Sequence, residues 1–341
     1  MKRGILAGLS IGISVIILIT FFFLLLPKDM SCNDGTENNN CSSIKPYICQ
    51  NGSLIEWPSI CGCGDLSEVI NNKCVSKYQD GAKDILLTYT LDGKKGIINF
   101  VVYKNLSDYL SKIPRYIETI DGKEATLFDF KMRSLDEKEQ KELLLPLVIA
   151  IENITKNKDD QARIAISLVQ NIPFGNSNKT IRFGDTYIEY YRYPYEVLYD
   201  LQGVCGEKSE LLSFLLRELG YETAFLYYVK ENHEATGIKC PIEKSLNRTG
   251  YCFIETTGPS IITDSQTEYL VLSKLKSSPE IIPIAGNLSF GRRNFYEYND
   301  AKTLEEIRML VKRYGEINIF QHLQFQNLKK KYGLLTFEYI F

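Results

Sequence analysis

The sequence predicts an α+β protein in which a helix that begins at a cysteine packs on an antiparallel sheet. Two observations support this class. After Cys205, leucines recur at helical spacing up to Leu219, and Gly220 follows where a C-terminal glycine belongs. Short runs rich in β-branched and aromatic residues, bounded by turn signals, lie before and after this helix and predict strands. One transmembrane helix and a small disulfide-rich segment are predicted ahead of this core.

The first predicted element is a membrane helix over residues 4–26, a run of 23 residues without a charge. At about 1.5 Å per residue it would span roughly 35 Å, enough for the hydrocarbon core of a bilayer. A cleaved signal has a shorter apolar region and a small-x-small cleavage site, which is not seen here. Lys2 and Arg3 predict a cytoplasmic N-terminus. The sequence therefore favours a single-pass protein of the cell membrane, with most of the chain extracytoplasmic, over a secreted one.

Glycosylation sequons agree with export. Their number exceeds the two or three expected by chance from the composition, which indicates a glycoprotein. The sequons begin at Asn40, Asn51, Asn105, Asn153, Asn178, Asn247 and Asn287.

Composition limits the classes of partner. The formal net charge is −2, which gives no electrostatic basis for binding nucleic acid. A hydrophobic fraction of 44% and a charged fraction of 24% are typical of a folded globular chain. No cofactor, metal site or calcium loop is indicated by the sequence.

Six of the nine cysteines crowd into a segment rich in Asn, Gly and Ser that is too poor in apolar residues to form its own core. Disulfides would stabilise such a segment. Zinc is the alternative, but the spacings lack paired C-x-x-C motifs and the segment has no histidine. Six cysteines allow 15 connectivities, which the sequence does not distinguish. The six are Cys32, Cys41, Cys49, Cys61, Cys63 and Cys74.

From Tyr78 onward, the expected elements follow in order. Two strands flank a turn at Asp92-Gly93, and a capping box at Ser134 and Glu137 precedes a helix kinked at Pro146. A second helix ends before Pro173. Strands are predicted at 223–229, 233–239, 251–257 and 280–285, and a helical pattern runs from Leu304 to Tyr314.

These elements group into five expected parts of the chain. They are a cytoplasmic N-terminus with the transmembrane helix (1–28), the Cys-rich segment (29–76), a β-rich part (77–133), the core that contains Cys205 (134–262) and a C-terminal extension with a strand and helices (263–341).

Cys205 stands at the start of its helix rather than inside the apolar stripe. The unpaired N–H groups and positive dipole end of a helix stabilise a thiolate, the nucleophilic form. The Cys205 N–H would also be available to an oxyanion, and Gly203 and Gly206 would leave room for a substrate carbonyl. The alternative is an inert, buried thiol. If the other eight cysteines pair, Cys205 is the odd one.

A reactive thiol needs a base, and the chain has only two histidines. His322 lies in a helical pattern without catalytic neighbours, whereas His233 opens a predicted strand. Glu255, the only carboxylate of "YCFIETT", would orient the His233 ring if the two strands pair with these residues opposite each other. That register would separate Cys240 from Cys252 by about 13 Å along the hairpin, too far for the disulfide otherwise expected in an exported protein.

"GVCGEKSELLSFLLRELGYETAFLYYV", "NHEATGI" and "YCFIETT" together resemble the transglutaminase-like superfamily of papain-related thiol enzymes, over about residues 134–260. The resemblance implies a papain-like core with Cys205 as nucleophile, His233 as base and then acid, and Glu255 as the orienting acid. The family more often has aspartate at the third position and an aromatic residue after the histidine, where this chain has Glu234. Gln202 is a candidate oxyanion donor in place of a tryptophan.

The combination predicts a thiol acyl-transfer enzyme that acts on amide groups of peptides or proteins, as a peptidase or amidase when water is the acceptor and as a transglutaminase when an amine is. Alternatively, the same fold serves as a surface binding protein without catalysis, or, less favoured, as a metal or redox module.

Overall fold

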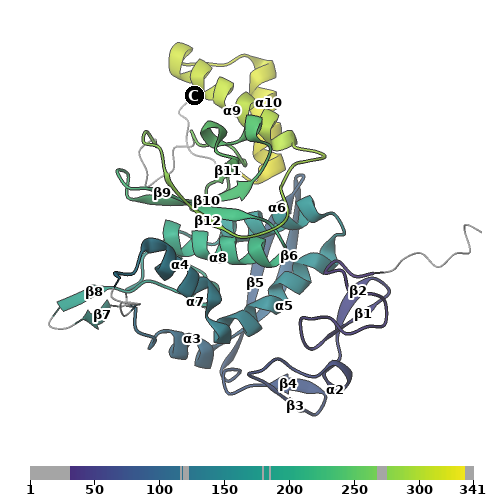
Figure 1. Ribbon diagram of the computed structural model, residues 1–341. Coiled ribbons are helices and arrows are strands. Elements are labelled where there is room, and N and C mark those ends of the chain that lie inside the picture. The colour runs from purple at the N-terminus through teal and green to yellow at the C-terminus, as the bar shows by residue number, and fades with distance from the viewer. Residues whose placement is uncertain are drawn as a thin grey trace, which may run out of the picture. The chain divides into compact units, whose positions relative to one another are not determined.

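The computed structural model describes residues 31–115, 117, 123–178, 180–183, 186–266 and 275–334. The chain is α+β, with antiparallel sheets and four disulfides (Figure 1). It forms two compact units. One comprises residues 31–63 with Val69–Cys74, and the other comprises Gly64–Glu68 with the chain from Val75 onward.

The predicted transmembrane helix is not supported. Among the helices that the structure describes, none combines the length and the apolar composition needed to cross a bilayer. Residues 4–26 lie outside the described residues. The expectation of a glycosylated single-pass protein of the cell membrane is corrected accordingly. The four disulfides are typical of a chain that folds in an oxidising environment.

All six cysteines of the Cys-rich segment form disulfides, as predicted. The pairs are Cys32–Cys49, Cys41–Cys61 and Cys63–Cys74. Between them lie only short elements. These are β1 (Tyr47–Gln50) paired with β2 (Ser53–Glu56), the single-turn helix α2 (Pro58–Cys61), and β3 (Glu68–Ile70) paired with β4 (Lys73–Val75).

The second unit is built on a four-stranded antiparallel sheet of order β11-β10-β9-β12. The strands are β9 (Thr223–Tyr228), β10 (His233–Lys239), β11 (Tyr251–Ile254) and β12 (Glu280–Ile284), close to the predicted ranges. Phe225, Ile238 and Ile254 enter the main core from one face, and alternate residues such as Leu226 and Phe253 form a smaller cluster on the other. This is the period-two alternation of strands.

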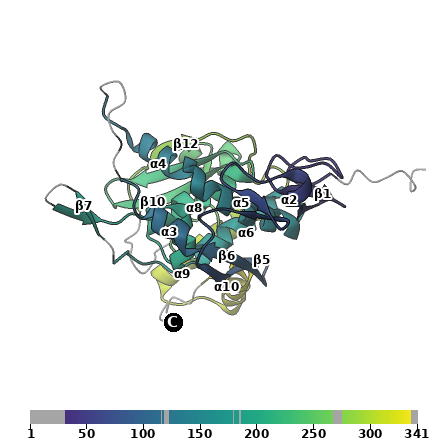
Figure 2. The same ribbon diagram turned by 90° about the horizontal axis from the view of Figure 1, so that it is seen from below.

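Helix α8 (Cys205–Glu218) packs its leucines against this sheet, and all five leucines of the predicted stripe are buried. Figures 1 and 2 show α8 between the sheet and a further layer of helices. The other helices before α8 are α3 (Lys104–Leu110), α4 (Leu127–Asp136), α5 (Lys138–Ile154), α6 (Lys158–Asn171) and α7 (Pro194–Asp200). A short hairpin, β7 (Thr180–Phe183) and β8 (Thr186–Glu189), precedes α7.

The predicted hairpin around Asp92-Gly93 is confirmed as β5 (Ala82–Leu91) and β6 (Lys94–Tyr103). Both turn residues have positive φ, at 47° and 74°, the geometry that favours an Asp-Gly pair. The predicted capping box at Ser134 is wrong, because Ser134 lies inside α4. Helix α4 is capped by Thr126, and the Ser134 hydroxyl donates to Glu210 instead.

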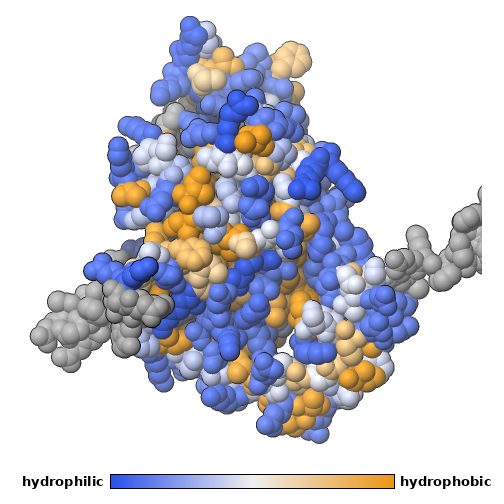
Figure 3. Space-filling model, viewed as in Figure 1, coloured by the Kyte–Doolittle hydropathy of each residue, from blue (hydrophilic) through white to orange (hydrophobic). Residues whose placement is uncertain are grey.

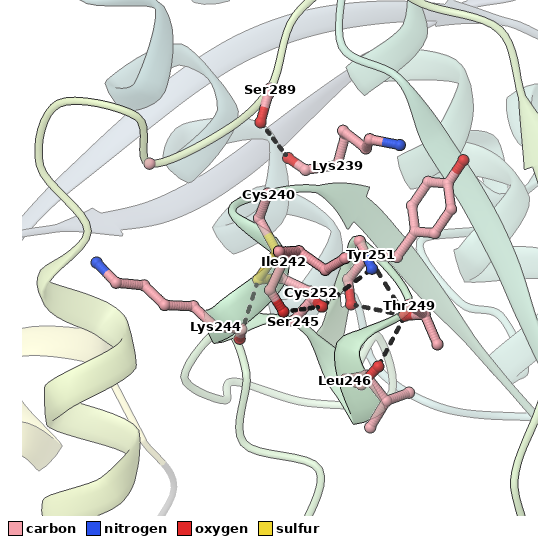
Figure 4. Close-up of a disulfide and its surroundings, with 12 residues drawn as sticks. Lys239, Cys240, Ile242, Lys244, Ser245, Leu246, Thr249, Tyr251, Cys252 and Ser289 are labelled. Atoms are coloured by element: carbon pink, nitrogen blue, oxygen red, sulfur yellow. Dashed lines mark hydrogen bonds between the residues drawn. A yellow bond between two sulfur atoms is a disulfide. The ribbon is translucent and has the colours of Figure 1, made fainter.

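The register of β10 and β11 differs by two residues from the one expected. Thr236 faces Ile254, and the Cys240 amide donates to the Gly250 carbonyl. Cys240 therefore lies one diagonal step from Cys252, with Cα atoms 5.8 Å apart, and the two form a disulfide (Figure 4). The expected separation of about 13 Å rested on the wrong register.

The C-terminal helical pattern extends further than predicted. Helix α9 (Tyr296–Tyr314) is followed by α10 (Ile319–Tyr332). Leu304 and Ala301 of α9 and Leu328 of α10 form a small core with Ile261. Within the predicted pattern of α9, Leu304 and Ile307 are buried, whereas Tyr314 is 62% exposed.

We expect Leu215→Ala in α8 to lower the free energy of unfolding by about 2–5 kcal/mol, because it removes a fully buried side chain from the main core. Leu86→Ala makes the same chemical change at a side chain that is 64% exposed and should alter stability by less than about 0.5 kcal/mol. Urea unfolding followed by circular dichroism measures both; equal effects would contradict the packing of α8 described above.

Candidate active site

Helix α8 begins at Cys205, preceded by Val204 in an extended conformation. Val204 has no side-chain acceptor, so it does not cap the N–H groups of the first helical turn. Of the nine cysteines, all within the described residues, only Cys205 is outside a disulfide, and its side chain is half-buried. A free thiol, the N–H groups of the first turn and the positive end of a fourteen-residue helix thus coincide.

The first turn of α8 is anchored by Glu207 rather than by a capping side chain before the helix. The Glu207 carboxylate accepts hydrogen bonds from the backbone amides of Val204 (3.0 Å) and Arg192 (2.7 Å) and forms an ion pair with the Arg192 guanidinium. Burial raises the pKa of Glu207, and these donors oppose the rise. The tyrosine-rich segment before α7 is thereby fixed to the start of the helix.

His233 and Glu255 meet at one end of the sheet. His233 is the first residue of β10, and Glu255 directly follows β11, its antiparallel neighbour. The His233 Nε2 and the Glu255 Oε2 are 2.9 Å apart, and both side chains are buried. The residues are diagonal neighbours rather than directly opposite, since the register pairs Thr236 with Ile254.

Glu255 is held as an ionised acceptor. Its Oε1 accepts from the amides of Thr256 and Thr257 (2.9 Å each) and from the Thr257 hydroxyl (2.8 Å). Burial alone would raise the pKa of Glu255, but the hydrogen bond and charge of His233, with the Thr257 donors, lower it. A carboxylate can only accept, so the proton between the two residues belongs to His233 Nε2.

The second ring nitrogen is consequently the one available to the thiol. His233 Nδ1 is buried and makes no well-aligned hydrogen bond with any described residue. Burial disfavours the charged ring, but hydrogen bonding and charge from Cys205 and from Glu255 outweigh it and raise the pKa of His233 to about 10. Contacts between catalytic groups are often poorly aligned before substrate binds.

A threonine links the backbone of the cysteine to the acid's strand. The Thr256 hydroxyl lies 3.3 Å from the Cys205 carbonyl oxygen, to which it can donate, and 3.2 Å from the Ser209 hydroxyl. Thr256 follows Glu255 directly, so the start of α8 and the end of β11 are tied at the site itself.

The glycines beside Cys205 serve packing more than open space. A Cβ on Gly206 would lie 2.7 Å from the Tyr191 hydroxyl, and one on Gly203 would lie 3.0 Å from Lys208 and 3.2 Å from Val197. The expectation that both glycines leave the flanks of the thiol bare is therefore wrong: they admit neighbouring side chains.

A buried charge cluster, which the sequence did not reveal, adjoins the site. The Lys131 ammonium of α4 contacts the carboxylates of Glu210 (2.8 Å) and Glu234 (2.9 Å) and the Tyr191 hydroxyl (2.9 Å). Glu234 is the residue after His233. Burial raises the pKa of Glu234, and the Lys131 charge opposes this.

Lys208, one turn after Cys205, is a second buried charge that the sequence did not reveal. Its ammonium donates to the carbonyls of Gln170 and Ile172 at the end of α6. Burial lowers the pKa of Lys208 to about 7, against the attraction of Glu255. Gln170 in turn donates to the backbone carbonyls of Glu255 (2.9 Å) and Ser260.

The other predicted site residues are placed as follows. The Gln202 amide lies against Gly175, and its role as an oxyanion donor stays a prediction. Cys240 and Cys252 are bonded to each other. Within the described residues, no three His, Cys, Asp or Glu side chains gather as metal ligands.

Comparisons with known proteins do not assign this chain to a family. No family model and no curated protein matches the chain. Among solved structures, it is similar to calcium-bound Legionella pneumophila LapG, with 12% identity and a TM-score of 0.27 over 52% of this chain and 98% of that one. A second L. pneumophila LapG structure gives 13% identity and a TM-score of 0.25 over 54% and 94%. Similarity this low carries no functional conclusion.

We expect the His233 ring to stay protonated well above neutral pH and to lose its proton near pH 10. Glu255→Gln should lower this pKa, because it removes the negative charge that favours the imidazolium while burial still disfavours it. NMR of histidine-labelled protein can follow the titration, since the chain has two histidines and His322→Gln assigns the other signal. A His233 that titrates at or below pH 6.5 would contradict this electrostatic description.

Proposed function

We propose that the protein is a thiol acyl-transfer enzyme that cleaves or transfers amide groups of peptides or proteins. The observation that supports this most is the unbridged Cys205 at the start of α8 together with the buried His233–Glu255 pair. Nucleophile, base and orienting acid are the three roles that such chemistry needs.

In the first step, the Cys205 thiolate attacks the carbonyl carbon of the amide, and a carbon–sulfur bond forms as the carbonyl electrons move to oxygen. In this proposal the uncapped N–H groups of the first turn of α8, including that of Cys205, stabilise the resulting oxyanion. The imidazolium of His233 then donates its Nδ1 proton to the leaving nitrogen, the carbon–nitrogen bond breaks, and a thioester remains on Cys205.

In the second step, the neutral His233 ring accepts a proton from the incoming nucleophile, which attacks the thioester and releases the thiolate. Water as the nucleophile gives a peptidase or amidase, and an amine gives a transglutaminase. Both acceptors remain within the proposal, since the groups described act identically with either.

Glu255 keeps Nε2 protonated throughout, so that Nδ1 is the atom that exchanges the proton. Because Thr256 and Thr257 hold the other carboxylate oxygen, Glu255 cannot rotate away from the ring without breaking three hydrogen bonds. This preorganisation is the expected function of the third member of a triad.

We expect His233→Ala to slow the alkylation of Cys205 by iodoacetamide at pH 7 at least about tenfold. Without the imidazolium, an ordinary thiol is only a few per cent ionised at that pH. His322→Ala is the matched control and should label as fast as the wild type. The rates are measured by mass spectrometry of the Cys205 peptide.

Slow labelling of Cys205 in the wild type, at the same rate in His233→Ala, would overturn the enzymatic proposal. It would favour the alternative in which the same fold binds a partner without catalysis.

A further inference from the structure

A pocket of about 230 Å³ opens beside the first turns of α8. It is bordered by α4, by Pro114 and Arg115 shortly after α3, and by the tyrosine-rich segment before α7. Its lining residues are Pro114, Arg115, Leu127, Phe130, Lys131, Arg133, Ser134, Tyr191, Arg192, Tyr193 and Glu210.

Tyr191 lines this pocket and lies beside the start of α8. Its hydroxyl lies where a side chain on Gly206 would begin, and Gly206 is the residue after Cys205. The same hydroxyl contacts Glu210, one helical turn further along α8, which lines the pocket (3.0 Å). Glu210 is five residues beyond Cys205, which is about 7.5 Å along the helix axis at about 1.5 Å per residue. An extended peptide advances about 3.3 Å per residue, so the pocket lies about two residues from a carbonyl held at the start of α8.

The charged groups that line the pocket already have partners, most of which lie outside its lining. Lys131 is paired with Glu210 and with Glu234 beneath the pocket. Arg115 is paired with Glu196 and donates to backbone carbonyls, and Arg133 has partners as well. Because the charged groups already have partners, the surface that remains available to a ligand is mainly apolar and aromatic.

That wall comes mainly from α4 and the tyrosines. Leu127 and Phe130 line the pocket and are 37% and 39% exposed, so both keep apolar surface available to a ligand. Hydrophobic side chains gather over α4 on the face shown in Figure 3.

We propose that this pocket binds a large apolar side chain, preferably an aromatic ring, of the peptide whose carbonyl Cys205 attacks. The proposal rests on the proposed function and names the substrate class of the same site. A cavity of about 150 Å³ lined by apolar groups accommodates benzene, so a pocket of 230 Å³ has room for the ring of Phe or Tyr.

The test uses chloromethyl ketones of capped dipeptides, in which the Cys205 sulfur bonds to the methylene carbon and chloride leaves. In one series the residue next to the ketone is Phe or Gly, and in the other series the residue before it is Phe or Gly. Each rate is divided by the same variant's iodoacetamide rate. We expect the Phe probe of one series to react about 10- to 100-fold faster than its Gly partner, from the burial of an aromatic side chain.

Phe130→Ala should reduce this Phe-to-Gly ratio toward one, because it removes part of the apolar wall. Phe128→Ala is the matched control, since Phe128 is a similarly exposed neighbour on α4 (45%) that does not line the pocket, and it should keep the wild-type ratio. A ratio near one in both series of the wild type, or an equal loss in the two variants, overturns the pocket proposal.

The two proposals fail differently. If the pocket proposal alone is wrong, wild-type Cys205 still reacts rapidly with iodoacetamide and still depends on His233, while the peptide probes show no preference for Phe. If the proposed function is wrong, the iodoacetamide rate is slow and independent of His233.

Discussion

The site depends on one buried ion pair at the end of two paired strands. Neither His233 nor Glu255 has appreciable exposure, so each is costly to bury without the other. The register of β10 and β11 brings them together, and the Cys240–Cys252 disulfide joins the same two strands at their other end. A shift by one residue would turn the His233 side chain to the opposite face of the sheet, away from Glu255. The contact between His233 and Glu255 therefore follows from strand pairing.

Two buried groups near Cys205 make contributions to folding stability that change with pH in opposite directions. The folded pKa of His233, about 10, exceeds its unfolded value, so its contribution to stability is full below about pH 6.5 and is lost as pH rises to 10. Burial gives Lys208 a folded pKa of about 7, below its unfolded value, so the unfolded chain binds more protons and stability rises between about pH 7 and 10.5. Between pH 7 and 10 the two effects oppose each other, and global stability is a poor indicator of either group.

Local patterns allowed the sequence to predict the helix of Cys205, the strands around it and the contact between His233 and Glu255. Scarcity helped, because the chain has only two histidines and one cysteine left after pairing. The alternation of side chains alone did not distinguish the two registers, since a shift of two residues keeps every side chain on the same face. The disulfide between Cys240 and Cys252 was the signal that could have fixed it.

The buried charged groups that the sequence did not reveal contact partners that lie far away along the chain. Lys131 is 79 residues from Glu210 and 103 from Glu234, so no local period links them. These groups nevertheless lie beside the site. Lys131 pairs α4 with the strand residue after His233, and the Tyr191 hydroxyl of the same cluster fills the space beside Gly206. Because α4 also supplies the apolar wall of the pocket, one buried lysine couples that wall to the strand that carries His233. Any shift of α4 that separated Lys131 from these two buried carboxylates would leave buried charges unpaired, which is costly.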